Sequence, residues 1–247
     1  MNILITGATG YVGSRLVRSL SADDVNILTL TRDLRKSELM FGKSARLKHC
    51  LVGDKESVIG FQADVVIHLA TLSSSRCDLQ ILEPMLRANI ELGVWLLEVL
   101  RESGRGFTFV NTGSFAEYRL GAAEGLKPAY LYTATKSAFR IFADYFRSMC
   151  SGMRLLTAVP YTIYGGKDTQ KKLIDYLFEA LESAEPVDMT AGEQVLDFVY
   201  IDDIVRFYRS VALSPLSLPE GEYHLGTGRG TKIRDLAGLI EDRKSVV

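Results

Sequence analysis

The feature that most constrains this chain is the stretch of residues 3–13, where a short aliphatic run ends in a turn with three glycines. From Val12 onward the apolar residues recur at helical spacing, so the pattern predicts a strand, a glycine turn and a helix in succession. In a dinucleotide-binding unit, Gly7 would permit the tight turn, Gly10 would let the backbone approach a pyrophosphate, and Gly13 would bring the helix close to the strand. The exposed N–H groups and positive dipole end of that helix would then hold the phosphates.

The same alternation of strand and helix continues along the chain. Further strands are expected at residues 25–31, 47–52, 63–70 and 107–112. The run at residues 64–70 is almost entirely apolar, which is typical of a parallel strand buried on both faces. We therefore predict an α/β fold with a Rossmann-type doubly wound parallel sheet and a site at the carboxyl ends of its strands. Residues 1–165 are expected to form this dinucleotide-binding domain and residues 166–247 a small, partial substrate-binding lobe, with residues 195–215 packing back on the domain.

Composition narrows the classes of function. The 247 residues are 47% hydrophobic, so the chain can bury a substantial core. The formal net charge is -1 and the basic residues are scattered, which argues against nucleic acid and membrane as partners. No signal peptide or membrane span is expected, because Thr6 and Gly7 interrupt the first apolar run. Cys50, Cys77 and Cys150 match no metal-binding spacing, so we expect no metal site and three buried thiols in a cytoplasmic protein.

A second group of polar residues indicates acid–base chemistry. Ser114 lies just after the strand expected at residues 107–112, and Tyr132 and Lys136 are four residues apart, so on a helix they share one face. A phenol with an ordinary pKa of about 10 is a weak acid–base group near neutral pH, and a positive charge from Lys136 would favour its phenolate form. Tyr130 is a rival phenol, but it is six residues from Lys136 and on another face of the helix.

These motifs resemble the extended branch of the short-chain dehydrogenase/reductase superfamily, the NAD-dependent epimerase/dehydratase family. The turn T-G-A-T-G-Y-V-G-S at residues 6–14 and the Y-x-x-x-K pair carry the resemblance, and further family-like segments at residues 159–165, 195–203 and 223–237 extend it to nearly the whole chain. Within this branch the pattern is nearest to the CDP-paratose and CDP-abequose synthases, which reduce a CDP-4-keto-3,6-dideoxyhexose. It implies a role in lipopolysaccharide O-antigen biosynthesis.

The resemblance also implies roles for single residues. Tyr132 would exchange a proton with the substrate oxygen, Ser114 would donate a hydrogen bond to that oxygen, and Lys136 would also hold the nicotinamide ribose. Asp54 would touch the adenine, and Asn89 matches an asparagine of the family. The residues expected to bind the cofactor are Gly7, Thr9, Gly10, Tyr11, Val12, Gly13, Arg32, Asp54, Leu69, Ala70, Thr71, Asn89, Thr112, Tyr132, Lys136 and Pro160.

The end of the second expected strand bears on the choice of cofactor. NAD users of this family carry Asp at the position of Thr31, whereas Arg32, Arg35 and Lys36 offer positive charge to the 2′-phosphate of NADP. We therefore expect NADP(H) to be preferred. NAD(H) stays an alternative, because the Asp33 carboxylate can serve the ribose hydroxyls.

The expected function is NADPH-dependent reduction of a nucleotide-linked 4-keto (dideoxy) sugar. An NAD-dependent nucleotide-sugar 4-epimerase is the first alternative, and a non-catalytic dinucleotide-binding redox sensor is the second. A 4,6-dehydratase is excluded, because Phe115 and Ala116 follow Ser114 where that enzyme needs an Asp-Glu pair. The family usually has Arg where this chain has Leu196, which leaves the substrate pyrophosphate to another basic residue. The candidates for that contact are Lys167, Lys171, Lys172, Arg229 and Arg234.

Two further expectations concern assembly and the end of the chain. By resemblance, helices near residues 88–100 and 132–149 would pair across a homodimer. Residues 242–247 abandon the apolar periodicity and match what a common sequencing-adapter end encodes before a stop codon. We therefore expect the coding sequence to be cut short there and the substrate lobe to be truncated.

Overall fold

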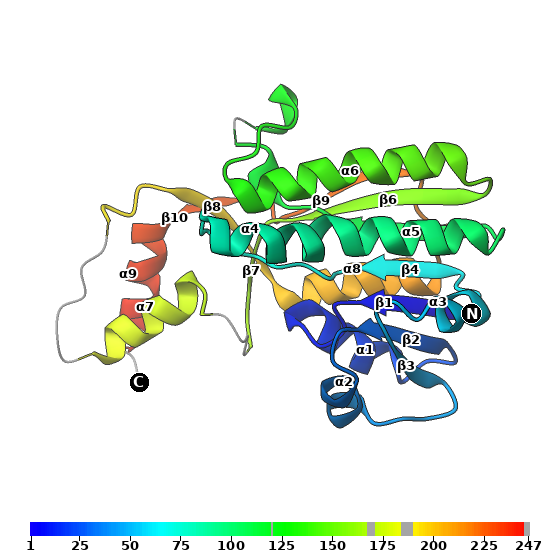
Figure 1. Ribbon diagram of the computed structural model, residues 1–247. Helices are drawn as coiled ribbons and strands as arrows, with labels where there is room; N and C mark the ends of the chain where they lie inside the picture. Colours follow the sequence, from blue (N-terminus) through cyan, green and yellow to red (C-terminus); the bar gives the residue numbers. More distant parts are fainter. Residues whose placement is uncertain (120, 167–170, 184–189, 245–247) are drawn as a thin grey trace.

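A parallel sheet of seven strands forms the centre of the molecule (Figure 1), in a computed structural model that describes residues 1–119, 121–166, 171–183 and 190–244. In spatial order the strands are β3 (Leu47–Leu51), β2 (Asn26–Thr31), β1 (Asn2–Thr6), β4 (Val65–His68), β5 (Phe107–Thr112), β6 (Met153–Pro160) and β9 (Gly221–Leu225). All neighbouring strands in this sheet run parallel. The strand order reverses between β1 and β4, which confirms the predicted Rossmann-type doubly wound α/β fold.

Helices cover both faces of this sheet. On one face lie α1 (Tyr11–Leu20) and α8 (Ile201–Leu213), and on the other lie α3 (Lys55–Phe61), α5 (Leu92–Glu102) and α6 (Leu131–Met149). Strand β1 shows why these strands are continuous apolar runs. Ile3 and Ile5 join the core under α1 and α8, whereas Leu4 joins the core under α5 and α6. All three side chains are fully buried, so a polar residue at any of these positions would be costly unless it found a partner.

The helix expected near residues 88–100 is part of a longer helical segment. It begins with α4 (Leu79–Leu86), passes through the π-helical turn η1 (Arg87–Glu91) and continues as α5. The Asp78 side chain caps α4 by accepting hydrogen bonds from the backbone N–H groups of Gln80 and Ile81. Pro84 lies inside α4. Because proline normally ends or kinks a helix, the sequence pattern did not predict that the helical segment begins before Pro84.

Shorter helices connect the strands. They are α2 (Leu34–Phe41), the 3-10 turn η2 (Phe115–Glu117) and the 3-10 turn η3 (Ala122–Glu124). Helix α2 joins β2 to β3. The turns η2 and η3 lie between β5 and α6, and Ser114 lies between the end of β5 and η2.

A smaller lobe lies beside the carboxyl ends of the main strands (Figure 1). Its elements are β7 (Thr162–Tyr164), α7 (Leu173–Glu182), β8 (Val195–Tyr200), β10 (Gly230–Lys232) and α9 (Ile233–Lys244). The three strands form a sheet in the order β10-β8-β7, and α7 packs against α9. Residues 221–225, which the sequence placed in this lobe, instead form β9 of the main sheet, because they pair with the edge of β6. Helix α8 packs against α1 and thus lies on the dinucleotide-binding domain.

The cysteines correct one expectation from composition. Cys50 and Cys150 are buried free thiols, but Cys77 is exposed, in the irregular segment before α4. The prediction of three buried thiols was therefore wrong for Cys77, since connecting segments run over the surface. Within the described ranges no helix is both long and apolar enough to cross a membrane. In the same ranges no three His, Cys, Asp or Glu side chains gather as metal ligands.

Candidate functional site

A cavity of about 1270 Å³ lies at the carboxyl edge of the main sheet. Its lining comes from the turn after β1, the ends of β2, β4 and β5, the first turns of α6, and residues at the junction with the lobe. Pockets for a single small ligand usually measure about 300–1,000 Å³. The cavity is therefore large enough for a dinucleotide and a second ligand beside it.

Most residues predicted from the sequence line this cavity. They are Gly7, Thr9, Gly10, Tyr11, Val12, Gly13, Arg32, Leu69, Ala70, Thr71, Thr112, Ser114, Tyr132, Lys136 and Pro160. They meet there because the carboxyl ends of parallel strands lie at one edge of the sheet. Asp54 and Asn89 do not line the cavity. The Asp54 carboxylate caps α3, accepting a hydrogen bond from the Ser57 backbone N–H at 3.0 Å.

The glycine turn has the shape that a pyrophosphate requires. Gly7 has a φ of +67°, and a Cβ atom there would lie 2.6 Å from the backbone nitrogen of Ala70. A Cβ atom at Gly13 would lie 2.2 Å from the Gly7 carbonyl oxygen, so α1 packs closer to the turn than a larger residue permits. Gly10 is the N-cap of α1 and offers no side-chain acceptor, which leaves the first N–H groups of the helix for a phosphate. The residues present therefore fit a dinucleotide.

Polar side chains hold the loop after β4, which forms one side of the cavity. Thr6 Oγ1 accepts a hydrogen bond from the Ala70 backbone N–H at 3.0 Å. Asn89 Oδ1 accepts a hydrogen bond from the Thr71 hydroxyl at 3.0 Å, and Asn89 Nδ2 donates one to Thr135 of α6 at 2.9 Å. Asn89 thus connects the loop that lines the cavity to α6 through hydrogen bonds, and it does not itself line the cavity.

The end of the cavity next to β2 is positively charged. Arg32 and Lys36 line it, whereas Asp33 does not. The Asp33 carboxylate caps α2, because its Oδ1 accepts a hydrogen bond from the Lys36 backbone N–H at 2.9 Å. A carboxylate that satisfies a helix N-terminus is less available to ribose hydroxyls. The charged side chains presented at this end are therefore both cations.

Ser114, Tyr132 and Lys136 line the same cavity and are almost fully buried, with exposed fractions of 9%, 9% and 3%. Tyr132 and Lys136 lie one turn apart on α6 and share its inner face. Tyr130 also lines the cavity, and its ring centroid is 6.0 Å from that of Tyr132. It is the N-cap residue of α6 and is exposed, so Tyr132 is the phenol enclosed together with Lys136.

Burial sets the protonation of both α6 residues. Burial raises the pKa of Tyr132 to about 12, although hydrogen bonds with Thr71 and Ser73 act in the other direction. This is opposite to the shift toward phenolate expected from Lys136, so the Tyr132 phenol is neutral near pH 7. Burial also lowers the pKa of Lys136 to about 8, although Glu117 opposes this change. The site therefore presents an un-ionised O–H beside an ammonium group that titrates near neutrality.

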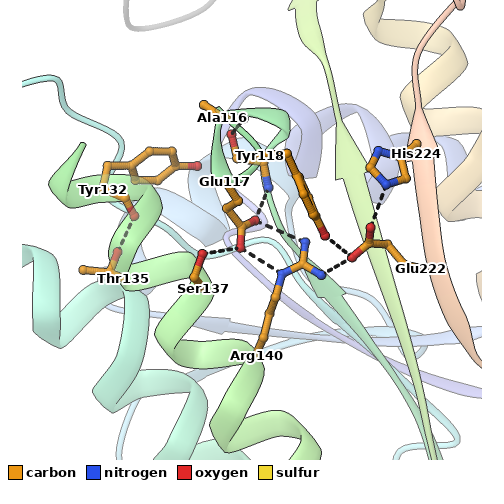
Figure 2. A network of polar contacts seen from close by, with 10 residues as sticks. Ala116, Glu117, Tyr118, Tyr132, Thr135, Ser137, Arg140, Glu222 and His224 are labelled. Carbon is orange, nitrogen blue, oxygen red and sulfur yellow. Dashed lines mark hydrogen bonds and ion pairs between the residues drawn. The ribbon is translucent and has the colours of Figure 1, made fainter. Parts of the chain in front are cut away.

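A network of ion pairs, buried at its Glu117 end and exposed at its Glu222 end, joins the Ser114 segment to α6 and β9 (Figure 2). Glu117 of η2 is fully buried, and its Oε2 lies 2.8 Å from Arg140 Nε on α6. Arg140 also pairs with Glu222 of β9, which accepts a hydrogen bond from the Tyr118 hydroxyl. Sequence reasoning missed Glu117. The Ser114-x-x-Glu117 spacing is that of a capping box, and this signal was sufficient to find it.

Five basic residues are candidates for the contact with a substrate pyrophosphate that Leu196 cannot make. Lys172 is the described candidate that lines the cavity, and its Nζ lies 3.7 Å from the centroid of the Tyr11 ring. The described candidates outside the cavity lining are Lys171, Arg229 and Arg234. Lys167 lies outside the described residues. A cation near the junction with the lobe is therefore supplied by Lys172.

Comparison with known proteins gives a family match over most of the chain. The NAD dependent epimerase/dehydratase family matches residues 3–226. CDP-abequose synthase of Salmonella typhimurium (strain LT2) is 28% identical over 255 residues, which cover 97% of this chain and 80% of the relative. CDP-abequose synthase of Yersinia pseudotuberculosis is 27% identical over 209 residues, which cover 83% of this chain and 71% of the relative. The family match includes the glycine turn, Ser114 and the Tyr132–Lys136 pair.

Solved structures share the fold. UDP-glucuronic acid 4-epimerase from Bacillus cereus, in complex with UDP-glucuronic acid and NAD, has a TM-score of 0.84 at 21% identity. The similarity covers 99% of this chain and 83% of that one. UDP-glucose 4-epimerase from Thermus thermophilus, in complex with NAD, has a TM-score of 0.79 at 23% identity, covering 98% of this chain and 83% of that one. At these identities the comparison supports the architecture and not a substrate.

Proposed function

The chain belongs to the NAD dependent epimerase/dehydratase family, and we propose that it uses NADPH to reduce a nucleotide-linked 4-keto (dideoxy) sugar. Membership confirms the predicted enzyme class, an oxidoreductase or epimerase of the extended short-chain dehydrogenase/reductase type. One observation carries the proposal: Ser114, Tyr132 and Lys136 line the same cavity as the glycine turn. A proton donor and a binding site for a dinucleotide thus lie in the same cavity. Transfer of a hydride and a proton to one carbonyl group requires this arrangement.

Each catalytic side chain has a separate task in this reaction. When bound, the nicotinamide cofactor supplies the hydride. Tyr132 gives its proton to the carbonyl oxygen, since burial raises its pKa to about 12 and keeps the phenol protonated near pH 7. Ser114 donates a hydrogen bond to the same oxygen as negative charge develops on it. Lys136, with its pKa lowered to about 8 by burial, is largely cationic at pH 7 and stabilises the phenolate that Tyr132 leaves behind.

The substrate class is supported by similarity and by the lining of the cavity. Two relatives named CDP-abequose synthase align with most of the chain. Phe115 follows Ser114, lines the cavity and stacks on Tyr161, with the ring centroids 5.5 Å apart. A dehydratase would carry an acidic pair at Phe115 and Ala116, so an apolar surface replaces acid–base groups there. An apolar surface suits a sugar that already lacks a hydroxyl group.

The preference for NADP(H) over NAD(H) is the part of the proposal that depends on charge. Arg32 and Lys36 line the cavity beside β2 and can pair with a 2′-phosphate. Asp33, the residue that favours NAD, is occupied as the cap of α2. The family description names NAD, and the two solved neighbours hold NAD. NAD(H) is therefore the alternative cofactor, and its affinity is to be compared with that of NADP(H).

One assay separates the proposed function from its alternatives. Incubating the protein with NADPH and a panel of nucleotide 4-keto sugars should consume NADPH and form the corresponding 4-hydroxy nucleotide sugar in equal amounts. A 4-epimerase would interconvert nucleotide sugars without net consumption of cofactor. A redox sensor would bind the dinucleotide and convert none of the panel. NADPH that is stable in the presence of every panel member would refute the proposal.

Assembly as a homodimer is also part of the proposal. Ile141, Phe142, Tyr145 and Met149 lie along α6 and are exposed, with Ile141 at 72%. Their spacing places them on one side of the helix, away from the buried Tyr132 face. Contiguous exposed apolar side chains mark interaction surfaces. We propose that α6, over residues 132–149, pairs with its copy together with the helical segment near residues 88–100.

A cytoplasmic location completes the proposal. The three cysteines are free thiols, and the cytosol keeps protein thiols reduced.

A further inference from the structure

We propose that Glu117 and Arg140 are positioning residues that hold Ser114 in place relative to Tyr132 and Lys136. The inference rests on the proposed function, because it assigns roles within the same site. Neither residue lines the cavity, so the role proposed for them is to position Ser114 and not to contact the substrate. Glu117 lies in η2, which follows β5, and Arg140 lies on α6, so the ion pair between them joins the two segments that carry the catalytic groups (Figure 2).

The Glu117 carboxylate is fully buried and surrounded by hydrogen-bond donors. Its Oε1 accepts from the Ser114 backbone N–H at 2.6 Å and from Arg140 Nη2 at 3.3 Å. Its Oε2 accepts from Arg140 Nε at 2.8 Å and from the Ser137 hydroxyl at 3.1 Å. A buried carboxylate is costly unless it is paired, so these four contacts favour one arrangement of the Ser114 backbone.

Arg140 carries this constraint to the catalytic helix. It lies one turn after Lys136 and two turns after Tyr132 on α6. Its guanidinium is itself held from a second side, by the ion pair with Glu222 and by the Tyr118 ring, whose centroid is 5.5 Å from Arg140 Cζ. The guanidinium therefore has little freedom to turn, and the Ser114 segment cannot shift along α6 without breaking an ion pair.

The glycine before Ser114 shows how closely the pair packs on the strand end. A Cβ atom at Gly113 would lie 2.6 Å from Arg140 Nη2 and 2.6 Å from Glu117 Oε1. Both distances are shorter than a non-bonded contact allows, so a side chain here would displace the ion pair. The residue next to Ser114 is thus a glycine that leaves room for Glu117 and Arg140.

The variant Glu117→Gln tests the proposal with almost no change in volume. Every group that contacts the Glu117 carboxylate donates a hydrogen bond to it. The amide nitrogen of glutamine is also a donor, so in Glu117→Gln it must face another donor, either Arg140 or the Ser114 N–H. We expect kcat to fall roughly ten- to hundredfold, the scale set by a small misplacement of a catalytic group. The affinity for NADPH and the midpoint of thermal unfolding measure whether the fold and the cofactor cradle are retained.

A second background separates positioning from general damage. If Glu117 acts through the Ser114 hydroxyl, Glu117→Gln should lower kcat in the parent but cause no further loss in Ser114→Ala. The proposal would be overturned if Glu117→Gln lowered kcat by the same factor in the parent and in Ser114→Ala. It would also be overturned if Glu117→Gln left the kcat of the parent unchanged.

The chain offers a matched control on the same helix. Arg147 of α6 pairs with Glu220, with 2.7 Å between Nε and Oε1, and Glu220 Oε1 also accepts the Leu155 backbone N–H at 2.9 Å. This pair has the same residue types as Glu117 and Arg140, but among the described residues its printed hydrogen bonds and ion pair involve no residue of the cavity lining. Glu220→Gln should therefore leave kcat unchanged, and a loss equal to that of Glu117→Gln would overturn the proposal.

Amide hydrogen exchange distinguishes this inference from the proposed function. If the parent reduces none of the 4-keto sugars, the proposed function fails, and exchange around Ser114 then decides the positioning role alone. Faster exchange of the segment at residues 112–118 in Glu117→Gln, but not in Glu220→Gln, would support it. Equal exchange in the parent and in Glu117→Gln would overturn it.

Discussion

Replacing Lys136 with methionine should make the protein more stable and less active. Lys136 is 3% exposed, and burial lowers its pKa from 10.5 to about 8. Below this value the lysine is charged in both the folded and the unfolded chain, and the folded chain bears the cost of burying the charge. One pKa unit corresponds to about 1.4 kcal/mol, so lowering the pKa from 10.5 to about 8 costs about 3 kcal/mol of folding free energy.

The size of this effect depends on pH in a defined direction. Between about pH 8 and pH 10.5 the folded lysine loses its proton while the unfolded lysine keeps it. The unfolded chain then binds more protons, so the stability of the parent rises with pH. Methionine has no proton to lose. The advantage of Lys136→Met should therefore be about 3 kcal/mol at pH 7 and should shrink toward zero above pH 10.5.

Urea unfolding of the parent and of Lys136→Met, at pH 7 and at pH 10 without added cofactor, measures this difference. Lys48 on β3 is exposed, so Lys48→Met is a control that should change stability by less than about 0.5 kcal/mol. A Lys136→Met protein that is less stable than the parent at pH 7 would refute the reasoning, as would an advantage that is equally large at pH 10. Turnover and NADPH binding should both fall in Lys136→Met, as expected where a catalytic group is kept at the expense of stability.

Four other substitutions in the site and on its surface have expected outcomes. Tyr132→Phe should lower reductase turnover about 10²–10⁴-fold with nearly unchanged NADPH affinity, because a positioned proton donor contributes that much; full activity would show that another group supplies the proton. Ser114→Ala should lower turnover less than Tyr132→Phe. Arg32→Asp should narrow or reverse the preference for NADPH over NADH in a binding titration, by about ten- to hundredfold for the charge-assisted bonds lost, and equal affinity of the parent for the two cofactors would contradict this. Ile141→Asp places a charge on the exposed apolar face of α6 and should convert a dimer to a monomer in light scattering; an unchanged mass would exclude that face.

Features that depend on residues close together in the chain could be predicted. The strand, turn and helix at residues 3–13 follow from spacing alone, and so does the shared face of Tyr132 and Lys136. The parallel sheet follows from the regular alternation of strands and helices, because parallel strands need a crossover connection. These features require only the period of a helix or a strand.

Competition between two uses of one side chain could not be predicted in the same way. The resemblance assigns Asp54 to the adenine and leaves Asp33 as a candidate for the ribose, and in the structure both carboxylates also cap the helix that follows them. An aspartate just before a helix fits either role. Lys171 and Lys172 are adjacent, but Lys172 lines the cavity while Lys171 pairs with Glu179.

Contacts between distant segments set the remaining features. Arg140 is separated by 23 residues from Glu117 and by 82 from Glu222, and no short pattern joins the three. Residues 221–225 belong to the main sheet because they form hydrogen bonds with the edge of β6. The pKa of Tyr132 moved upward because the packed chain excludes water from the phenol more strongly than its neighbours stabilise the phenolate. A local pattern specifies which side chains share a face, whereas the distance between faces and the water removed from them depend on how the whole chain packs.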